Sequence, residues 1–159
     1  MGMTGVFRRA DRDLVSALQA GSRKTSEVLF DDSGLGLDLD KAWHGLNWLL
    51  CGDAWGTGDK PEGLAIMGGV EFGEELGYGK ARLLEPEQVQ ACAAALATIS
   101  VADLEARFEP SAMQEDEVYP DIWDEGPGAL EYLTSYFEPL RGFYSAAAEA
   151  GDHVLLAVV

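Results

Sequence analysis

The chain has 159 residues, with 11 lysines and arginines against 28 aspartates and glutamates, and its formal net charge is −17. Residues 1–84 hold 13 acids and 9 bases (net −4), whereas residues 85–159 hold 15 acids and 2 bases (net −13). Phosphate backbones and anionic lipids repel such a chain, which argues against nucleic-acid and membrane partners, whereas a basic protein would be attracted.

Short elements are predicted in the first part of the chain. Alternating side chains predict a strand over residues 3–8. Apolar residues at helical spacing predict a helix over 11–20, which Gly21 ends, and a second short helix over 26–30. The turn that follows leads into the most informative stretch of the chain.

Residues 39–51 predict a helix that holds two of the four tryptophans, one of the two histidines and one of the two cysteines. Asp38 is the expected N-cap, and Gly52 is the expected left-handed residue at the C-terminal end. One face carries the apolar stripe of a core-facing helix: Leu39, Ala42, Trp43, Leu46, Leu49 and Leu50.

The opposite face of this helix carries Lys41, His44, Trp48 and Cys51. An indole and an imidazole are unusual on a solvated helix face. Either the helix is buried on both sides, with His44 hydrogen-bonded to a neighbour, or this face lines a pocket. Gly45 lies close to the same face and would let a ligand or another backbone approach.

The middle of the chain mixes loops and regular elements. The glycine-rich residues 52–61 lack the Gly-Lys-Ser/Thr of a phosphate loop and the third glycine of a dinucleotide loop, so we expect a plain loop that carries Trp55. Residues 64–79 fit neither helical nor strand periodicity and are expected to be irregular. Residues 80–84 predict a strand.

The second half of the chain is mainly helical. Pro86 is expected to open a helix, and Ser100 with Asp103 resembles a capping box for the next one, which Pro110 ends. Residues 127–150 predict a long helix with a kink or break at Pro139. A buried strand is expected over the final residues, 153–159.

Residues 111–126 contain only acidic charges: Glu115, Asp116, Glu117, Asp121, Asp124 and Glu125. Their spacing does not match a calcium-binding EF-hand loop, so we predict no metal site. The apolar residues 118–120 and 122–123 within this segment are expected to pin it against the body of the protein.

These patterns predict an α+β fold: one domain over residues 1–159, with several helices packed on a small mixed sheet that includes the N-terminal and C-terminal strands. No signal-peptide pattern or long apolar run occurs, and Cys51 and Cys92 lie far apart without metal-ligand spacing. We therefore expect a cytoplasmic protein with free thiols and no cofactor.

Several segments, in this order and spacing, resemble the YfbM-like family of bacterial proteins: Met1–Phe7, Leu37–Trp43, Gly77–Gly79, Leu84–Glu87, Glu117–Pro120 and the helix-to-strand ending. The resemblance covers nearly the whole chain. It implies an α+β domain of unknown function in the bacterial cytoplasm and supplies no catalytic residues. It draws attention to positions that include Asp40, Lys41, Tyr119 and Pro120.

A non-catalytic binding or interaction role is the preferred hypothesis. The partner would be a small ligand beside the 38–51 helix or a basic protein, and the ligand-binding candidates are Asp40, Lys41, His44, Trp48, Tyr119 and Trp123. The alternative is an acid/base enzyme that pairs His44 with a carboxylate of the 115–125 segment. No known catalytic triad or metal motif is present. Oligomeric state cannot be inferred.

Overall fold

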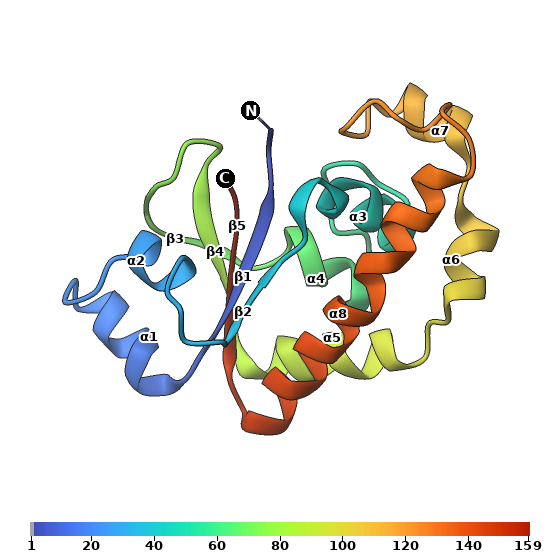
Figure 1. Ribbon diagram of the computed structural model, residues 1–159. Coiled ribbons are helices and arrows are strands. Elements are labelled where there is room, and N and C mark those ends of the chain that lie inside the picture. The colour runs from blue at the N-terminus through green and yellow to red at the C-terminus, as the bar shows by residue number, and fades with distance from the viewer. Residues whose placement is uncertain (1) are drawn as a thin grey trace.

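A five-stranded sheet lies at the centre of the computed structural model, which describes residues 2–159 (Figure 1). Its strand order is β2-β1-β5-β4-β3. The strands are β1 (Gly5–Ala10), β2 (Gly36–Asp38), β3 (Val70–Glu75), β4 (Lys80–Leu84) and β5 (His153–Val158). Neighbouring strands all pair antiparallel. The α+β prediction is confirmed, but the expected mixed sheet is corrected to an antiparallel one.

The sheet is covered on both faces because its central strands alternate two sets of apolar side chains. Phe7 and Leu156 point into the larger core, whereas Val6 and Leu155 point into the smaller one. Helices α1 (Arg12–Gln19) and α2 (Thr25–Leu29) cover the smaller core, and the remaining helices lie on the other side (Figure 1). Strand β5 is therefore buried on both faces, as predicted.

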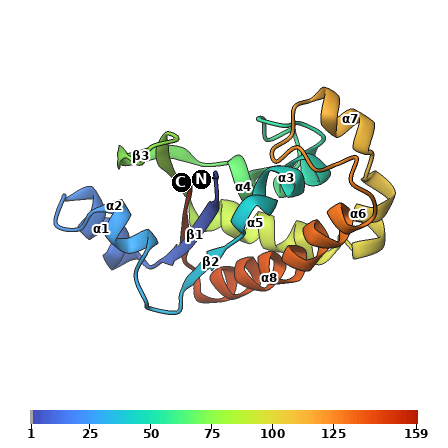
Figure 2. The same ribbon diagram turned by 45° about the horizontal axis from the view of Figure 1, so that its top comes forward.

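The larger layer contains two 3-10 turns and six α-helices: η1 (Asp40–Ala42), α3 (Trp43–Cys51), η2 (Pro61–Gly63), α4 (Leu64–Met67), α5 (Pro86–Ala97), α6 (Val101–Arg107), α7 (Pro110–Glu115) and α8 (Gly128–Ala150). Helices α5 and α8 lie side by side across this layer (Figure 2). Within residues 2–159 no single helix is long and apolar enough to cross a membrane. Helices α5 and α6 meet the length and composition criteria only when counted together, and a bend of 86° separates them.

The helix expected over 39–51 starts later than predicted. Asp38 is not an N-cap but the last residue of β2, where it pairs with Val6, and its carboxylate accepts a hydrogen bond from Asp40 N (2.7 Å). Leu39 N then donates to Gly5 O (2.8 Å). These contacts to β1 hold the segment extended, so α3 begins only at Trp43. The C-terminal end is as predicted, since Gly52 adopts a left-handed φ of 75°.

Three further segments differ from expectation. Residues 64–79, expected to be irregular, hold helix α4 and strand β3. Helix α6 ends at Arg107, before Pro110, and Pro110 itself opens α7, a position where its missing N–H costs nothing. Helix α8 runs from residue 128 to residue 150 without a break at Pro139.

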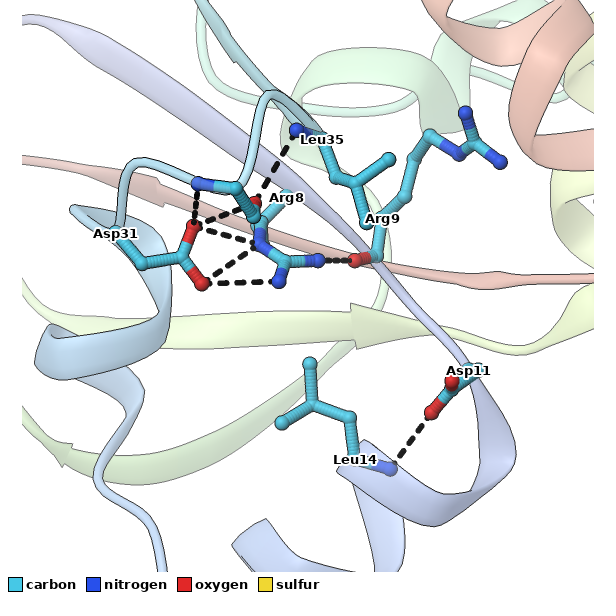
Figure 3. Close-up of polar contacts among 7 residues, drawn as sticks. Arg8, Arg9, Asp11, Leu14, Asp31 and Leu35 are labelled. Carbon is cyan, nitrogen blue, oxygen red and sulfur yellow. Dashed lines mark hydrogen bonds and ion pairs between the residues drawn. The ribbon is translucent and has the colours of Figure 1, made fainter.

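A partly buried ion pair fixes the loop between α2 and β2 (Figure 3). Arg8 on β1 donates from Nε and Nη2 to the Asp31 carboxylate, with the Nη2 bond at 2.9 Å. These bonds hold the pKa of Asp31 well below its usual range. Ser33 also donates to Asp31, so the loop is held from both sides.

Candidate functional site

The acidic 115–125 segment lies over the back of α3, where it covers His44. The imidazole is fully buried, and its Nδ1 accepts a hydrogen bond from Tyr119 N (2.8 Å). Trp43 stacks on the ring at 4.6 Å, and Trp55, itself 58% exposed, lies over it at 4.3 Å. Burial lowers the pKa of His44, and the backbone carbonyl of Ala54 partly opposes this shift. Because Nδ1 accepts the bond from Tyr119 N, it carries no proton, and the histidine serves to anchor Tyr119.

Two tryptophans fix the same segment. Trp48 is half-buried, and its Nε1 donates to Asp116 Oδ2 (2.7 Å). Trp123 is 1% exposed, and its Nε1 donates to Val118 O (2.7 Å). A Cβ on Gly45 would lie only 2.7 Å from Trp123 Cη2. Gly45 thus admits the Trp123 ring.

Asp40 and Lys41 hold α8 against this region, and Tyr119 holds the start of the chain. Tyr132 Oη donates to Asp40 Oδ2 (3.1 Å) and accepts from Lys41 N (3.2 Å). Burial and the Asp40 carboxylate raise the pKa of Tyr132. Tyr119 Oη accepts from Met3 N (3.2 Å). The Lys41 side chain is exposed and runs beside the same N-terminal residues.

The structure thus brings all six candidates into one region, where most of them hold neighbouring segments in place through hydrogen bonds. Within residues 2–159, His44 hydrogen-bonds a backbone amide and no carboxylate of the 115–125 segment. The acid/base alternative therefore has no geometric support. Of the six candidates, only Trp48 lines the cleft that opens beside α3.

This cleft, of about 470 Å³, lies at the C-terminal end of α3. The last turn of α3 forms its base, the 58–62 loop one wall and the end of α6 the other. Its lining residues are Trp48, Leu49, Leu50, Cys51, Gly52, Gly58, Asp59, Lys60, Glu62, Ala106, Arg107 and Glu109. Burial raises the pKa of the Cys51 thiol, so the cleft holds no activated cysteine nucleophile.

Both walls of the cleft are held by specific contacts. Arg107 Nη1 donates to Leu49 O (3.0 Å), which ties α6 to the end of α3. On the other side the backbone of Gly63 packs so tightly that a Cβ there would lie 1.6 Å from Thr57 O. Only glycine fits at that position, and the 57–63 loop is consequently compact.

Glu62 is the unusual group in the cleft. The residue is only 8% exposed, and no hydrogen bond or ion pair among the described residues engages its carboxylate, whose oxygens still touch solvent. Burial, and then the negative charge of Glu62, raise the pKa of Cys92 to about 12, so the carboxylate lies near the buried thiol. In the part of the chain that the structure describes, no cluster of three His, Cys, Asp or Glu residues could hold a metal ion.

Comparison with known proteins identifies a family. Residues 1–157 match the family described as "Domain of unknown function (DUF1877)". The chain belongs to this family. Its fold also resembles that of YfbM, a protein of unknown function from Escherichia coli, with a TM-score of 0.77 and 22% sequence identity over 98% of this chain and 99% of that chain. This confirms the YfbM-like resemblance, and at that identity the likeness shows the fold alone. No curated protein matches.

The cleft of this DUF1877 member contains residues that sequence reasoning missed: Lys60, Glu62 and Arg107. Arg107 could have been noticed, because it is one of only two bases after residue 84. Glu62 had no such signal, since an acidic residue after Pro61 in a glycine-rich segment is expected to be exposed.

Proposed function

We propose that this protein is a non-catalytic binding domain whose small ligand occupies the cleft at the C-terminal end of α3. The placement of Glu62 carries this proposal. The residue is only 8% exposed, so packing holds its side chain in place, and its solvent-touching carboxylate has no hydrogen-bond partner in the protein. The cleft thus offers a ligand a fixed hydrogen-bond acceptor.

The shape of the cleft also supports a small ligand. Its volume of about 470 Å³ lies within the roughly 300–1,000 Å³ usual for small-molecule sites. Trp48 supplies an aromatic wall, and Lys60 and Arg107 supply exposed charges at the rim. The free thiols of Cys51 and Cys92 support the proposed cytoplasmic location.

A blocked cleft tests this function. Ala106→Trp would place an indole in the cleft, whereas Ala102→Trp changes another exposed residue of α6 that is not part of the lining. A metabolite library is screened by thermal shift and by NMR of the indole N–H signals. We expect ligands that stabilise the wild type and Ala102→Trp but not Ala106→Trp. Equal ligand responses in all three proteins would contradict a site in this cleft.

We propose a basic protein as a second class of partner, because the acidic 115–125 segment is held in place on the surface. Its carboxylates are exposed and held in place by the tryptophan and histidine contacts described above. The triple variant Asp121→Asn, Asp124→Asn, Glu125→Gln removes three of these charges. A purified partner should bind the wild type in a salt-sensitive manner and bind this variant more weakly. Affinity unchanged by salt and by the three substitutions would refute a charge-driven interface.

A further inference from the structure

We propose that the free edge of β2 binds an extended basic segment of a partner protein, which adds to the sheet as a further antiparallel strand. This surface shares no residue with the cleft beside α3 or with the acidic 115–125 segment, so the inference goes beyond both proposed functions. It follows from the free backbone groups of the edge, the hollow beside them and the side chains that line that hollow.

Strand β2 ends the sheet on one side, and the chain stays extended for one residue beyond each of its ends. Before the strand, Arg9 N donates to Leu35 O (3.0 Å), and after it Leu39 N donates to Gly5 O (2.8 Å). Residues 35–39 therefore all lie beside β1. At about 3.3 Å per residue, this edge has room for an added strand of about the same length.

Every second residue of this segment has free backbone groups. In an antiparallel pair, residues that bond to the partner strand alternate with residues whose N–H and C=O point away from it. The two flanking bonds assign residues 35, 37 and 39 to β1, so Gly36 and Asp38 direct their backbone groups to the open edge. Within residues 2–159 no turn, loop or cap hydrogen bond engages those groups. The edge can therefore bond to another strand.

A hollow of about 500 Å³ lies beside this edge. It is bounded by β1 and β2, by the end of α2 and by the loop that follows α2 (Figure 1). Its lining includes Phe30, which is 59% exposed and is one of five large apolar side chains exposed among the described residues. The ion pair between Arg8 and Asp31 holds the loop in place (Figure 3). The surface is therefore formed before a partner binds.

The charges of the hollow select a basic partner. Three aspartates line it, Asp31, Asp32 and Asp38, and no lysine, arginine or histidine does. Asp31 is paired with Arg8, whereas Asp32 and Asp38 are exposed and take part in no ion pair of the described residues. Lysine or arginine side chains of a partner would pair with these two carboxylates and pack their aliphatic stems on the Phe30 ring.

The same charges argue against a second copy of this chain as the occupant. Two β2 edges side by side would bring Asp32 and Asp38 of one copy close to those of the other, and like charges on neighbouring strands are destabilising. The formal net charge of −17 adds a repulsion of longer range. Charged side chains commonly protect edge strands against self-association. This edge is thus closed to its own copy and open to a basic strand.

The two faces of the sheet determine the pattern of the partner segment. Asp38 pairs with Val6, which points into the smaller core, so partner residues opposite Gly36 and Asp38 turn their side chains toward the hollow. The residues between them turn to the other face, where Leu35 is 38% exposed. A segment that alternates basic and apolar residues matches both faces. Its basic residues are also those whose N–H groups bond to β2.

Four hexapeptides test this assignment. The first is acetyl-Lys-Val-Lys-Val-Lys-Val-amide, and the second has glutamate in place of lysine. The third carries N-methyl groups on its lysines only and the fourth on its valines only, so these two have the same composition and charge but lose different backbone donors. Each peptide is titrated into the ¹⁵N-labelled full chain at about 150 mM salt, where distant charges are screened, and amide NMR signals are followed.

Two variants of the chain are titrated in parallel. Asp32→Asn/Asp38→Asn removes the free charges of the hollow. Asp121→Asn/Asp124→Asn makes the same charge change at exposed positions of the 115–125 segment and serves as the control. Circular dichroism checks that both variants are folded.

The lysine peptide should bind and shift the amide signals of Gly36 and Asp38, and the glutamate peptide should not bind. N-methylation of the lysines should abolish binding, whereas N-methylation of the valines should preserve it, because only the lysine N–H groups face β2. Asp32→Asn/Asp38→Asn should weaken binding about 2- to 30-fold, as expected for two exposed ion pairs, and the control variant should leave the affinity unchanged.

Several results would overturn the assignment. Equal affinity for the lysine and glutamate peptides would exclude a role for charge, and equal affinity for the two N-methylated peptides would exclude strand pairing. Shifts confined to the 115–125 segment, or an equal loss in both variants, would place the basic partner elsewhere. Signals of Gly36 and Asp38 that move with protein concentration alone would show that a second copy occupies the edge. No shift at about 5 mM peptide, where millimolar affinities register, would also refute it.

Discussion

Replacing Gly45 by alanine should destabilise the protein, whereas the same change at Gly142 should stabilise it. Both glycines lie inside helices, Gly45 in α3 and Gly142 in α8. A Cβ at Gly45 would lie 2.7 Å from Trp123 Cη2 and 2.7 Å from Leu133 Cδ2, whereas a Cβ at Gly142 would meet no atom within 4 Å. The pair therefore separates the effect of packing from that of helix propensity.

The magnitudes follow from two opposing terms. Glycine to alanine inside a helix gains about 0.5–1 kcal/mol, and this gain is the whole effect expected at Gly142. At Gly45 the extra methyl group overpacks the core, which costs about 1–3 kcal/mol. Trp123 and Leu133 are 1% and 0% exposed, so neither ring nor methyl group can move into solvent. The packing cost exceeds the propensity gain, for a net loss of up to about 2.5 kcal/mol.

Urea unfolding and thermal melts of both variants measure the outcome. In a domain of this size about 1 kcal/mol corresponds to a midpoint shift of about 2–4 °C, downward for Gly45→Ala and upward for Gly142→Ala. A gain at Gly45 equal to that at Gly142 would refute the reasoning. It would mean that Trp123 does not pack on α3, and that the back of this helix is free for a ligand after all.

Three further changes probe the same region and the long helix. Because burial lowers the pKa of His44, the unfolded chain binds a proton more readily than the folded protein, and the free energy of unfolding should fall as the pH drops below 6.5. His44→Asn keeps an acceptor for Tyr119 N–H and should flatten that fall in urea titrations across pH; an identical slope would contradict this. Asn47→Ala removes a side chain that donates to the carbonyls of residues 53, 54 and 56, so it should cost about 1–3 kcal/mol and speed amide exchange in that loop; unchanged exchange would show that other contacts hold it. Pro139→Ala restores a hydrogen-bond donor inside α8 and should stabilise the protein by up to about 3 kcal/mol in urea unfolding, whereas a loss would show that the proline ring packs usefully.

Elements with strong local signals were predicted well. Pro86 opens α5, Ser100 and Asp103 form the capping box of α6, and Gly52 ends α3. In each case the deciding hydrogen bonds or backbone angles involve residues within one helical turn, so a short stretch of sequence contains all the information.

Elements that depend on distant partners were predicted poorly. Strand β2 exists because residues 36–38 pair with β1, and that pairing displaces the start of α3 to Trp43. The antiparallel direction of the sheet likewise follows from how β1, β4 and β5 pair. The spacing of apolar residues within one strand does not determine that direction. Long-range pairing outweighs local propensity in these places.

The sequence by itself determined the chemistry of the back of α3: which residues project there, that an indole and an imidazole need partners, and that a pinned acidic segment follows. Only the tertiary structure decided that this segment supplies the partner, since Tyr119 N reaches His44 across 75 residues of chain. It also decided that Glu62, near the other end of the helix, is only 8% exposed. Burial depends on segments that meet only after folding, and the residue type alone does not reveal how much of a side chain they cover.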